Sequence, residues 1–451
     1  MQRSLGLVLL GTFTLRFSTG LTGGLLSYYL ARLPEHGGQE VHALTFSFLT
    51  VAFYGTELLL STPFGLLSDR LGHHRIMQLG PLFGGVAVVL TWATTDLLLL
   101  GGTRILEGAS TAASVPSILG FIAAVTAGDE LLRGRAAARF EGATLAGLGV
   151  GLVAAAPLYK GIGDWGGLGR DAFLLNGLIY VLSFCIYRFG VDPANEVVAR
   201  HAPGSGRTAP PTRVTGWRAY PALLRDSSVL VLAPTWIALN AAIGLWTTQS
   251  IFNMVKRPTD PRFVDQLLMG RFEPNQISVG LGIGLVLFFI GLAFWGDRFK
   301  RIRRTTIIFY GVCGGAAIVG AALLLNHSDG WPDLFRLPPL AVVLGGLFVL
   351  AGATPAALGL LADTSEAHPA DRGAIMGLYS VFLALGQIVG SLLGGVAAEI
   401  RGIDGILVAT LILLAIALAP LSRLRAVEHR LEPLLEEVPG GGEVSAASTA
   451  G

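Results

Sequence analysis

The sequence predicts an all-α integral membrane protein whose twelve transmembrane helices form two pseudo-symmetric six-helix bundles around a central cavity. Of the 451 residues, 52% are hydrophobic and only 14% are charged, whereas an average soluble protein is about a quarter charged. The mean hydropathy of +0.63 excludes a soluble enzyme, a disordered chain and a secreted disulfide scaffold. The chain also contains twelve long apolar runs, and its two halves repeat one another.

The apolar runs have the length of membrane-spanning helices. A helix needs about 20 mostly apolar residues to cross the hydrocarbon core, and these runs lack the alternation of transmembrane β-strands. The first run carries Arg16 near its middle and has no small-residue cleavage site, so it is predicted to be a span and not a signal peptide. The predicted spans are 4–31, 42–67, 76–96, 98–126, 136–160, 170–189, 226–253, 275–295, 305–326, 338–362, 374–398 and 403–424.

The basic residues predict the orientation and the domains. With the N-terminus inside, 21 of the 32 Lys and Arg residues fall in inner segments and 9 in outer loops, which predicts a multi-pass protein of the inner (plasma) membrane with both termini cytoplasmic. The longest inner connection contains HAPGSGRTAPPTR, a composition typical of a flexible linker. We expect an N-terminal bundle over 1–189, a linker over 190–225, a C-terminal bundle over 226–425 and a disordered cytoplasmic tail over 426–451.

The two halves of the chain share sequence features at constant offsets. Asp69-Arg70 after the second span is repeated 228 residues later as Asp297-Arg298 after the eighth. Five identities or similarities at an offset of 239 relate the fifth and eleventh spans. Duplicated six-helix halves are typical of alternating-access carriers. The five pairs are Arg133/Arg372, Gly134/Gly373, Phe140/Tyr379, Gly147/Gly386 and Gly151/Gly390.

Two motifs resemble those of a known family. GLLSDRLGHHR, from Gly65, resembles the loop 2–3 signature of the major facilitator superfamily, and LGGTRILEGAS, from Leu100, resembles its span 4 signature, with Glu107 in the place of a Gln. The resemblance covers about residues 1–425 and is greatest to the twelve-helix drug:proton antiporters, although GLGVGLVAAAP in the fifth span lacks the proline and the glycine pair common in that branch. The matching positions are Gly65, Leu67, Asp69, Arg70, Gly72, Leu100, Arg104, Gly108 and Ser110.

The first motif is predicted to form a gating loop. Glycines permit a tight turn and close helix approach, and a carboxylate is stabilised near a helix N-terminus. The resemblance implies that Asp69 contacts the start of the eleventh span in the outward-open state and releases it on switching. We expect His73 and His74, which stand where the family prefers basic residues, to be solvated. The gating residues are Gly65, Asp69, Arg70, Gly72, Arg75, Asp297, Arg298 and Arg372.

Ionisable residues within the spans are candidates for proton coupling, because such groups are costly in a bilayer unless they are paired or hydrated. We place the coupling carboxylate at Glu107, with Arg104 as its modulator one helical turn away, and we keep Glu57 as the second choice. The alternative is that Arg104–Glu107 or Arg16–Glu57 are static ion pairs that only lock helices together. The five candidates are Glu107, Glu57, Glu141, Arg104 and Arg16.

The C-terminal half supplies neutral polar and aromatic residues instead of charges. Such a wall suits an amphipathic organic solute, because it offers contact area and few fixed charges. The predicted substrate-cavity residues are Asn240, Trp246, Gln249, Tyr379 and Gln387.

The resulting functional hypothesis is a proton-coupled secondary active transporter that works by alternating access and exports a lipophilic or amphipathic small organic molecule. The alternatives are an uptake symporter or exporter of an anionic metabolite, with Arg16 and Arg104 as anion partners, and a non-transporting membrane assembly protein of the same fold. No constellation of catalytic, metal-ligating or nucleotide-binding residues stands out, so we expect no enzyme activity, cofactor or metal. The expected partners are a small-molecule substrate, protons and the lipid bilayer, with no nucleic acid, and we expect a monomer.

Overall fold

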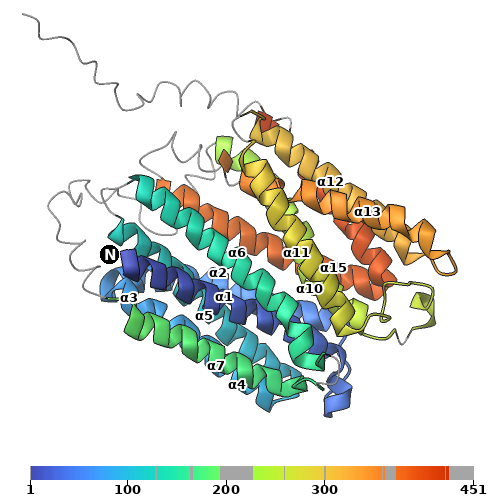
Figure 1. Cartoon of the computed structure of the whole chain (residues 1–451), viewed down its shortest axis with the longest axis horizontal. Coiled ribbons are helices and arrows are strands. Elements are labelled where there is room, and N and C mark those ends of the chain that lie inside the picture. The colour runs from blue at the N-terminus through green and yellow to red at the C-terminus, as the bar shows by residue number, and fades with distance from the viewer. Residues whose placement is uncertain are drawn as a thin grey trace, which may run out of the picture.

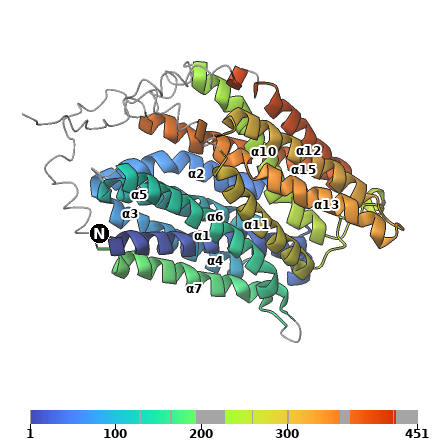
Figure 2. The same ribbon diagram turned by 45° about the horizontal axis from the view of Figure 1, so that its top comes forward.

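The computed structural model describes residues 2–126, 130–162, 166–192, 227–258, 260–298, 301–357, 359–360, 372–421 and 423–425. Over these residues the long helices run side by side, with the N-terminal half in blue to green and the C-terminal half in yellow to red (Figures 1 and 2). The linker predicted over 190–225 lies outside the described residues from 193 onward, and so does the whole predicted tail over 426–451.

The twelve predicted spans are confirmed as helices. Ten helices of the described residues are long and apolar enough to cross a membrane, and one of these, Val381–Arg425, comprises two predicted spans. The seventh span is a helix of 29 residues. The helices are α1 (Gln2–Ala31), α2 (Ala43–Leu71), α3 (His73–Met77), α4 (Leu79–Ala93), α5 (Leu97–Val125), α6 (Glu130–Lys160), α7 (Ala172–Cys185, continued by a π-helical turn, Ile186–Gly190), α10 (Ser227–Val255), α11 (Pro274–Gly296), α12 (Arg304–Asn326), α13 (Asp333–Leu350) and α15 (Arg372–Leu418).

Glycines in the left-handed region break the chain at two of the inter-span turns. Gly72 has φ +101° and separates α2 from α3. Gly402, with φ +59°, interrupts α15 between the eleventh and twelfth predicted spans. Both conformations are strained for residues with a Cβ atom. At the second break the side chain of Gln266 donates to the Arg401 carbonyl (2.9 Å) and accepts from the Ile403 amide (2.8 Å), so the interrupted backbone keeps its hydrogen bonds.

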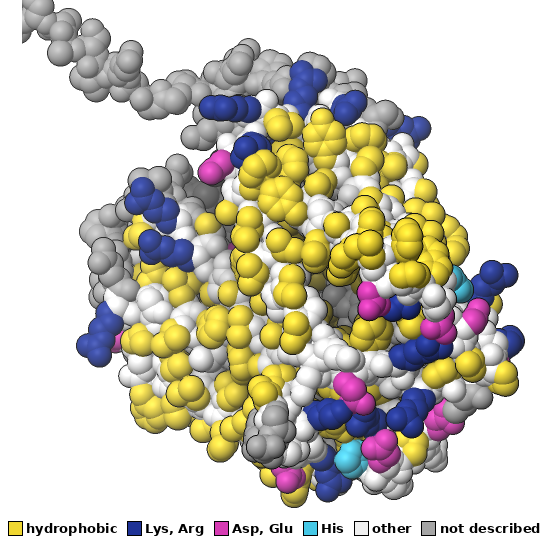
Figure 3. Space-filling model, turned by 45° about the vertical axis from the view of Figure 1, so that its right-hand side comes forward, with side chains coloured by type: hydrophobic (Ala, Val, Ile, Leu, Met, Phe, Trp, Pro, Cys, Tyr) yellow, Lys and Arg dark blue, Asp and Glu magenta, His cyan; other side chains and the backbone are white. Residues whose placement is uncertain are grey.

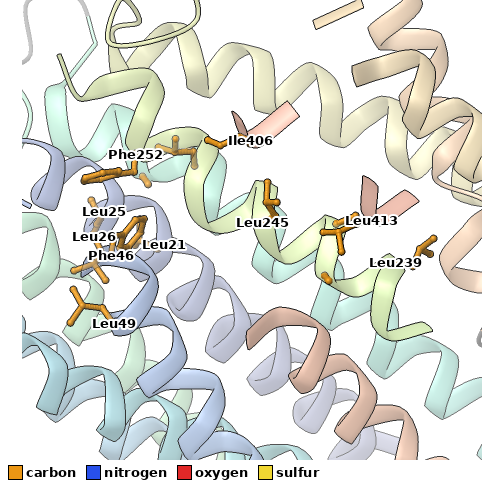
Figure 4. Packing of buried hydrophobic residues seen from close by; sticks show 14 of the residues in the cluster. Leu21, Leu25, Leu26, Phe46, Leu49, Leu239, Leu245, Phe252, Ile406 and Leu413 are labelled. Atoms are coloured by element: carbon orange, nitrogen blue, oxygen red, sulfur yellow. The ribbon is translucent and has the colours of Figure 1, made fainter. Parts of the chain in front are cut away.

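Within each half the helices pack in pairs, and among the described residues four main helix pairs join the two halves. In the N-terminal half, α1 packs on α6 and α2 on α5, while in the C-terminal half α10 packs on α15 and α12 on α13. Between the halves, α2 contacts both α15 and α10, α6 contacts α11, and α1 contacts α10. Leucines of α1 lie beside Phe46 of α2 and Phe252 of α10 (Figure 4), whose ring centroids are 5.0 Å apart. Apolar packing therefore continues across the junction of the halves.

The duplicated glycines make equivalent helix contacts in the two halves. A Cβ atom on Gly147 of α6 would lie 2.8 Å from the Arg16 Cβ of α1, and one on Gly386 of α15 would lie 2.5 Å from the Asn240 Cβ of α10. Only glycine permits such close helix approach, which in a membrane is the main source of packing energy. Arg16 and Asn240 thus occupy corresponding positions of the two halves.

Candidate functional site

Arg104 and Glu107 form a buried ion pair on α5. The guanidinium Nη1 contacts the Glu107 carboxylate one turn along the helix, and the guanidinium also stacks over the Phe53 ring of α2, 4.7 Å from its centroid. Only 9% of Arg104 and 3% of Glu107 are exposed. Gly108 brings α2 against this turn, since a Cβ atom there would lie 2.3 Å from the Phe53 carbonyl oxygen. The two charges neutralise one another in a closely packed helix contact.

Arg16, Glu57 and Glu141 are arranged differently. They lie on α1, α2 and α6, and each is half-buried. Arg16 interacts electrostatically with both carboxylates, yet none of the three is within 4.0 Å of an oppositely charged group among the described residues. Arg16 on α1 is therefore near enough to Glu57 on α2 and Glu141 on α6 to act on both carboxylates.

The C-terminal half carries amide side chains in the part of the bundle where the N-terminal half carries charged ones. Asn240, the counterpart of Arg16, donates through Nδ2 to the Trp236 carbonyl (2.9 Å). Gln387 is buried on α15 against Gly244, and its Oε1 has no hydrogen-bond partner among the described residues. Trp246 of α10 is partly exposed. The side chain of Tyr379 lies outside the described residues, so its predicted place in the cavity wall stays a prediction.

Gln249 is not on an accessible wall. It is fully buried, and its Nε2 donates to the Ala43 carbonyl (3.1 Å) and to the Ser47 hydroxyl (2.8 Å) of α2. Ser47 in turn donates to the Ser391 carbonyl of α15 (2.6 Å). This network joins the halves toward the end of the molecule opposite the start of α1. We call that end the outer end, following the predicted orientation, and the other the inner end.

Ion pairs also join the halves at the outer end. Lys160 at the end of α6 contacts Glu273, which caps α11, and Arg32 approaches the same carboxylate within 3.7 Å. The hydrogen bond from Lys160 holds the pKa of Glu273 below its ordinary value. Lys256, after α10, donates to the Val41 carbonyl (2.7 Å) and pairs with Glu40 (3.1 Å), whose pKa it also lowers. These contacts tie the two halves together at the outer end.

The gating loop at the inner end makes different contacts. The Asp69 side chain is 69% exposed, and the nearest basic group in the described residues is the His73 ring, 3.8 Å away. Arg70, Arg75 and Asp297 are exposed. The side chain of Arg372 lies outside the described residues, so the predicted contact of Asp69 with the start of the eleventh span stays a prediction.

The two loop histidines are buried, so the expectation that they are solvated is wrong. His73 is 8% and His74 5% exposed. His73 Nδ1 lies 3.1 Å from the Ser68 hydroxyl, and His74 Nε2 donates to the Tyr187 carbonyl (2.9 Å) at the π-helical end of α7. Close packing against α5 at Gly120, where a Cβ atom would lie 2.5 Å from the His73 ring, excludes water from this turn.

Sequence reasoning missed the contacts that join the halves at the outer end. Lys160 and Glu273 are 113 residues apart, and Ser47 and Gln249 are 202 apart, so no local pattern relates them. One signal was present: Glu273 precedes Pro274 and is followed three residues later by Gln276, which is the pattern of a capping box. It predicts a helix start, but not the partner from the other half.

Comparison with known proteins gives three findings. The Major Facilitator Superfamily model matches residues 8–335 and 272–446. A curated relative, the multidrug resistance protein MdtG of Proteus mirabilis (strain HI4320), is 25% identical over 162 residues, which are 36% of this chain and 37% of the relative's length. The nucleoside transporter NupG has a similar structure, with a TM-score of 0.62, 13% identity and coverage of 94% of this chain and 98% of that one; a point mutant of NupG has a TM-score of 0.63, the same identity and coverage of 94% and 99%. At this identity the two structures show the fold alone.

Proposed function

The chain belongs to the major facilitator superfamily and is a membrane transporter and not an enzyme, and on this basis we propose that it is a proton-coupled exporter of a lipophilic or amphipathic small organic molecule. The proposal rests mainly on Arg16, Glu57 and Glu141, which are ionisable, half-buried and outside any ion pair in the described residues. Groups of this kind are costly within a bilayer. Their presence is explained if Glu57 and Glu141 take up and release protons during transport while Arg16, which stays protonated, balances their charge.

Glu57 is the preferred coupling residue, with Glu141 beside Arg16 as its companion. Our first choice from the sequence, Glu107, is held by Arg104 and is almost inaccessible, so it would have to break an ion pair before exchanging a proton. Breaking a buried pair costs about 3–5 kcal/mol. An unpaired, half-buried carboxylate meets no such barrier. A proton and a cationic solute could then compete for Glu57, which is the simplest scheme for exchange.

The opposite wall favours an amphipathic solute. Trp246 is partly exposed and supplies an aromatic surface, and Asn240 and Gln387, which are buried in this conformation, supply neutral amides, so hydrophobic contact area is combined with few fixed charges. The resemblance of one third of the chain to a multidrug resistance protein agrees with such a solute. If sugars or inorganic anions bound tightly and lipophilic compounds did not, this assignment of the substrate class would be abandoned.

One observation favours a second candidate. Arg16 is a guanidinium without an ion pair in the described residues, and this group binds carboxylates and phosphates well. An anionic metabolite could therefore be the transported solute. A stability screen at two pH values distinguishes the classes, because a bound ligand raises the apparent stability by mass action. We expect lipophilic cations to stabilise the protein more at high pH, where Glu57 and Glu141 are ionised, and anions to stabilise it more at low pH.

The decisive experiment is transport by Glu57→Gln in reconstituted vesicles, with ethidium as the probe. We expect this variant to lose accumulation driven by a pH gradient while it retains counterflow, because the neutral amide still permits the conformational cycle. The matched control is Arg104→Gln/Glu107→Gln, which removes a neutral pair and should retain gradient-driven accumulation. If Glu57→Gln accumulated ethidium normally, coupling would have to be assigned to Glu107 or Glu141, or rejected.

A further inference from the structure

A groove opens on the C-terminal half, away from the charged residues of the N-terminal half. It has a volume of about 520 Å³ and is bounded by α12, α13 and the end of α11. Its lining is almost wholly apolar and includes Trp295, Tyr310, Cys313 and Val342, of which Tyr310 and Val342 are more than 40% exposed. Hydrophobic side chains cover the middle of this side of the molecule, while charged side chains gather at opposite margins (Figure 3).

Glycines create the groove. Gly314 of α12 and Gly346 of α13 pack backbone against backbone, since a Cβ atom on either would lie within 2.8 Å of the carbonyl oxygen of the other. This contact forms the floor. The adjacent Gly345 is exposed and has no atom within 4 Å of its Cβ position, so the space above it is open. The groove is therefore a shallow channel between two closely packed helices.

The groove extends from near the inner end of α12 to its middle. Its lining residues on α12 run from Tyr310 to Ala317, a helical rise of about 10 Å at 1.5 Å per residue. Half of a bilayer's hydrocarbon core is about 15 Å thick. The groove thus covers the depth of acyl chains in a single leaflet, the one at the inner end.

Basic side chains stand at the inner mouth of the groove. The Arg298 guanidinium lies over the Phe294 ring, 3.4 Å from its centroid, and that ring is 5.4 Å from the ring of Trp295, which lines the groove. The Arg301 amide donates to the Arg298 carbonyl (2.9 Å), which brings both arginines onto one turn. Arg301 is exposed and makes no side-chain hydrogen bond or ion pair with the described residues.

We propose that this groove binds an anionic phospholipid, with one acyl chain between α12 and α13 and the phosphodiester between Arg298 and Arg301. The apolar channel matches the hydrocarbon chain in chemistry and depth. The guanidinium groups match the phosphate in charge and in hydrogen-bonding geometry. A zwitterionic lipid fills the same channel but gains less from the two arginines, because its headgroup carries a compensating positive charge.

The test is titration of the purified, detergent-solubilised full-length protein with phosphatidylglycerol or phosphatidylcholine, with bound lipid counted by native mass spectrometry. We expect selective retention of phosphatidylglycerol. Arg298→Gln/Arg301→Gln should weaken its binding roughly 30-fold, since each basic residue contributes about fivefold near an anionic surface, and should weaken phosphatidylcholine binding by a smaller factor. The control is Arg3→Gln, an exposed arginine at the inner end of α1.

A second variant tests the acyl-chain channel. In Gly345→Leu the new side chain starts in open space and occupies the groove, so this variant should reduce the binding of both lipids. Gly320→Leu is its matched control, because Gly320 of α12 is likewise exposed, has no atom within 4 Å of its Cβ position and does not line the groove. The proposal would be overturned if the native protein bound the two lipids equally. It would also be overturned if Arg298→Gln/Arg301→Gln or Gly345→Leu bound phosphatidylglycerol as tightly as the native protein does.

Discussion

The contact of α1 with α6 and the contact of α10 with α15 both depend on glycines at corresponding positions, but the polar side chains beside these glycines differ in charge. Gly147 and Gly386 approach the neighbouring helix at Arg16 and Asn240, which differ by one charge. Around Arg16 lie two carboxylates, whereas the Asn240 amide donates within its own helix. Duplication thus preserved the packing of the halves while the polar groups diverged, and the ionisable groups within the described spans are concentrated in the N-terminal half.

The largest effect is expected at the buried pair, where the N-terminal half neutralises its own charges. Glu107→Gln leaves Arg104 buried without a counter-charge, and loss of one partner of such a pair costs about 3–5 kcal/mol. Arg104→Gln/Glu107→Gln should recover much of that loss. Thermal denaturation in detergent measures both, with Glu57→Gln as the unpaired control. If Glu107→Gln were as stable as the native protein, burial of Arg104 without its counter-charge would carry no such cost.

The shared packing is tested by Gly151→Leu and Gly390→Leu. A Cβ atom at these positions would lie 2.1 Å from the Phe17 carbonyl oxygen and 2.0 Å from the Ala241 carbonyl oxygen, respectively. Overpacking of this kind typically costs about 1–3 kcal/mol. Both variants should lose thermal stability to a similar extent, whereas Gly142→Leu, which meets no atom within 4 Å, should not. Loss in only one half would show that the two contacts are not equivalent.

The difference between the halves is tested by Arg16→Asn, which gives the N-terminal half the residue of its counterpart. We expect the rate of ethidium transport to fall about tenfold, equivalent to roughly 1.4 kcal/mol, because Glu57 and Glu141 lose the cation that faces them. Asn240→Ala should change the rate far less, since its amide donates within α10. Both rates are measured in vesicles at equal protein content. Similar losses in the two variants would indicate that the halves contribute alike.

Asp69 and its repeat Asp297 are compared by Asp69→Asn and Asp297→Asn. We expect Asp69, but not Asp297, to hold the halves together in the outward-open state. Asp69→Asn should then shift the equilibrium toward the inward-open state by about 1 kcal/mol, at the low end of typical coupling energies. Spin-label distances across the inner end report the populations. An unchanged distance distribution for Asp69→Asn, with normal transport, would remove the latch.

The smallest effect is expected at the outer-end ion pair. The depressed pKa of Glu273 means that its pairing with Lys160 stabilises the contact between the halves at the outer end above the ordinary pKa of 4.5 and is lost as pH falls through the depressed value. Exposed pairs contribute less than about 1 kcal/mol. Spin-label distances across the outer end should therefore lengthen slightly on acidification below pH 4.5, and Glu273→Gln should show the longer distances already at pH 7. Asp329→Asn, a change at an exposed outer acid that pairs with Arg271 within the C-terminal half, should have no such effect.

The sequence by itself determined the spans, the position of the break between the last two, and the placement of Arg104 and Glu107 on one face of a helix. These depend on local quantities: hydropathy over about 20 residues and a spacing of three along a helix. The duplication was also readable, because glycines that permit close helix contact must recur at a constant offset.

Only the tertiary structure decided which polar groups are paired across helices. Gln249 looked like a cavity residue, but it bonds to α2 of the other half; His73 and His74 looked solvated, but α5 and α7 cover them. Lys160 and Glu273 are in contact although 113 residues separate them in the sequence. Periodicity gives the direction of a side chain about its own helix, whereas its partner depends on how helices distant in sequence pack together, and that packing is a property of the whole fold.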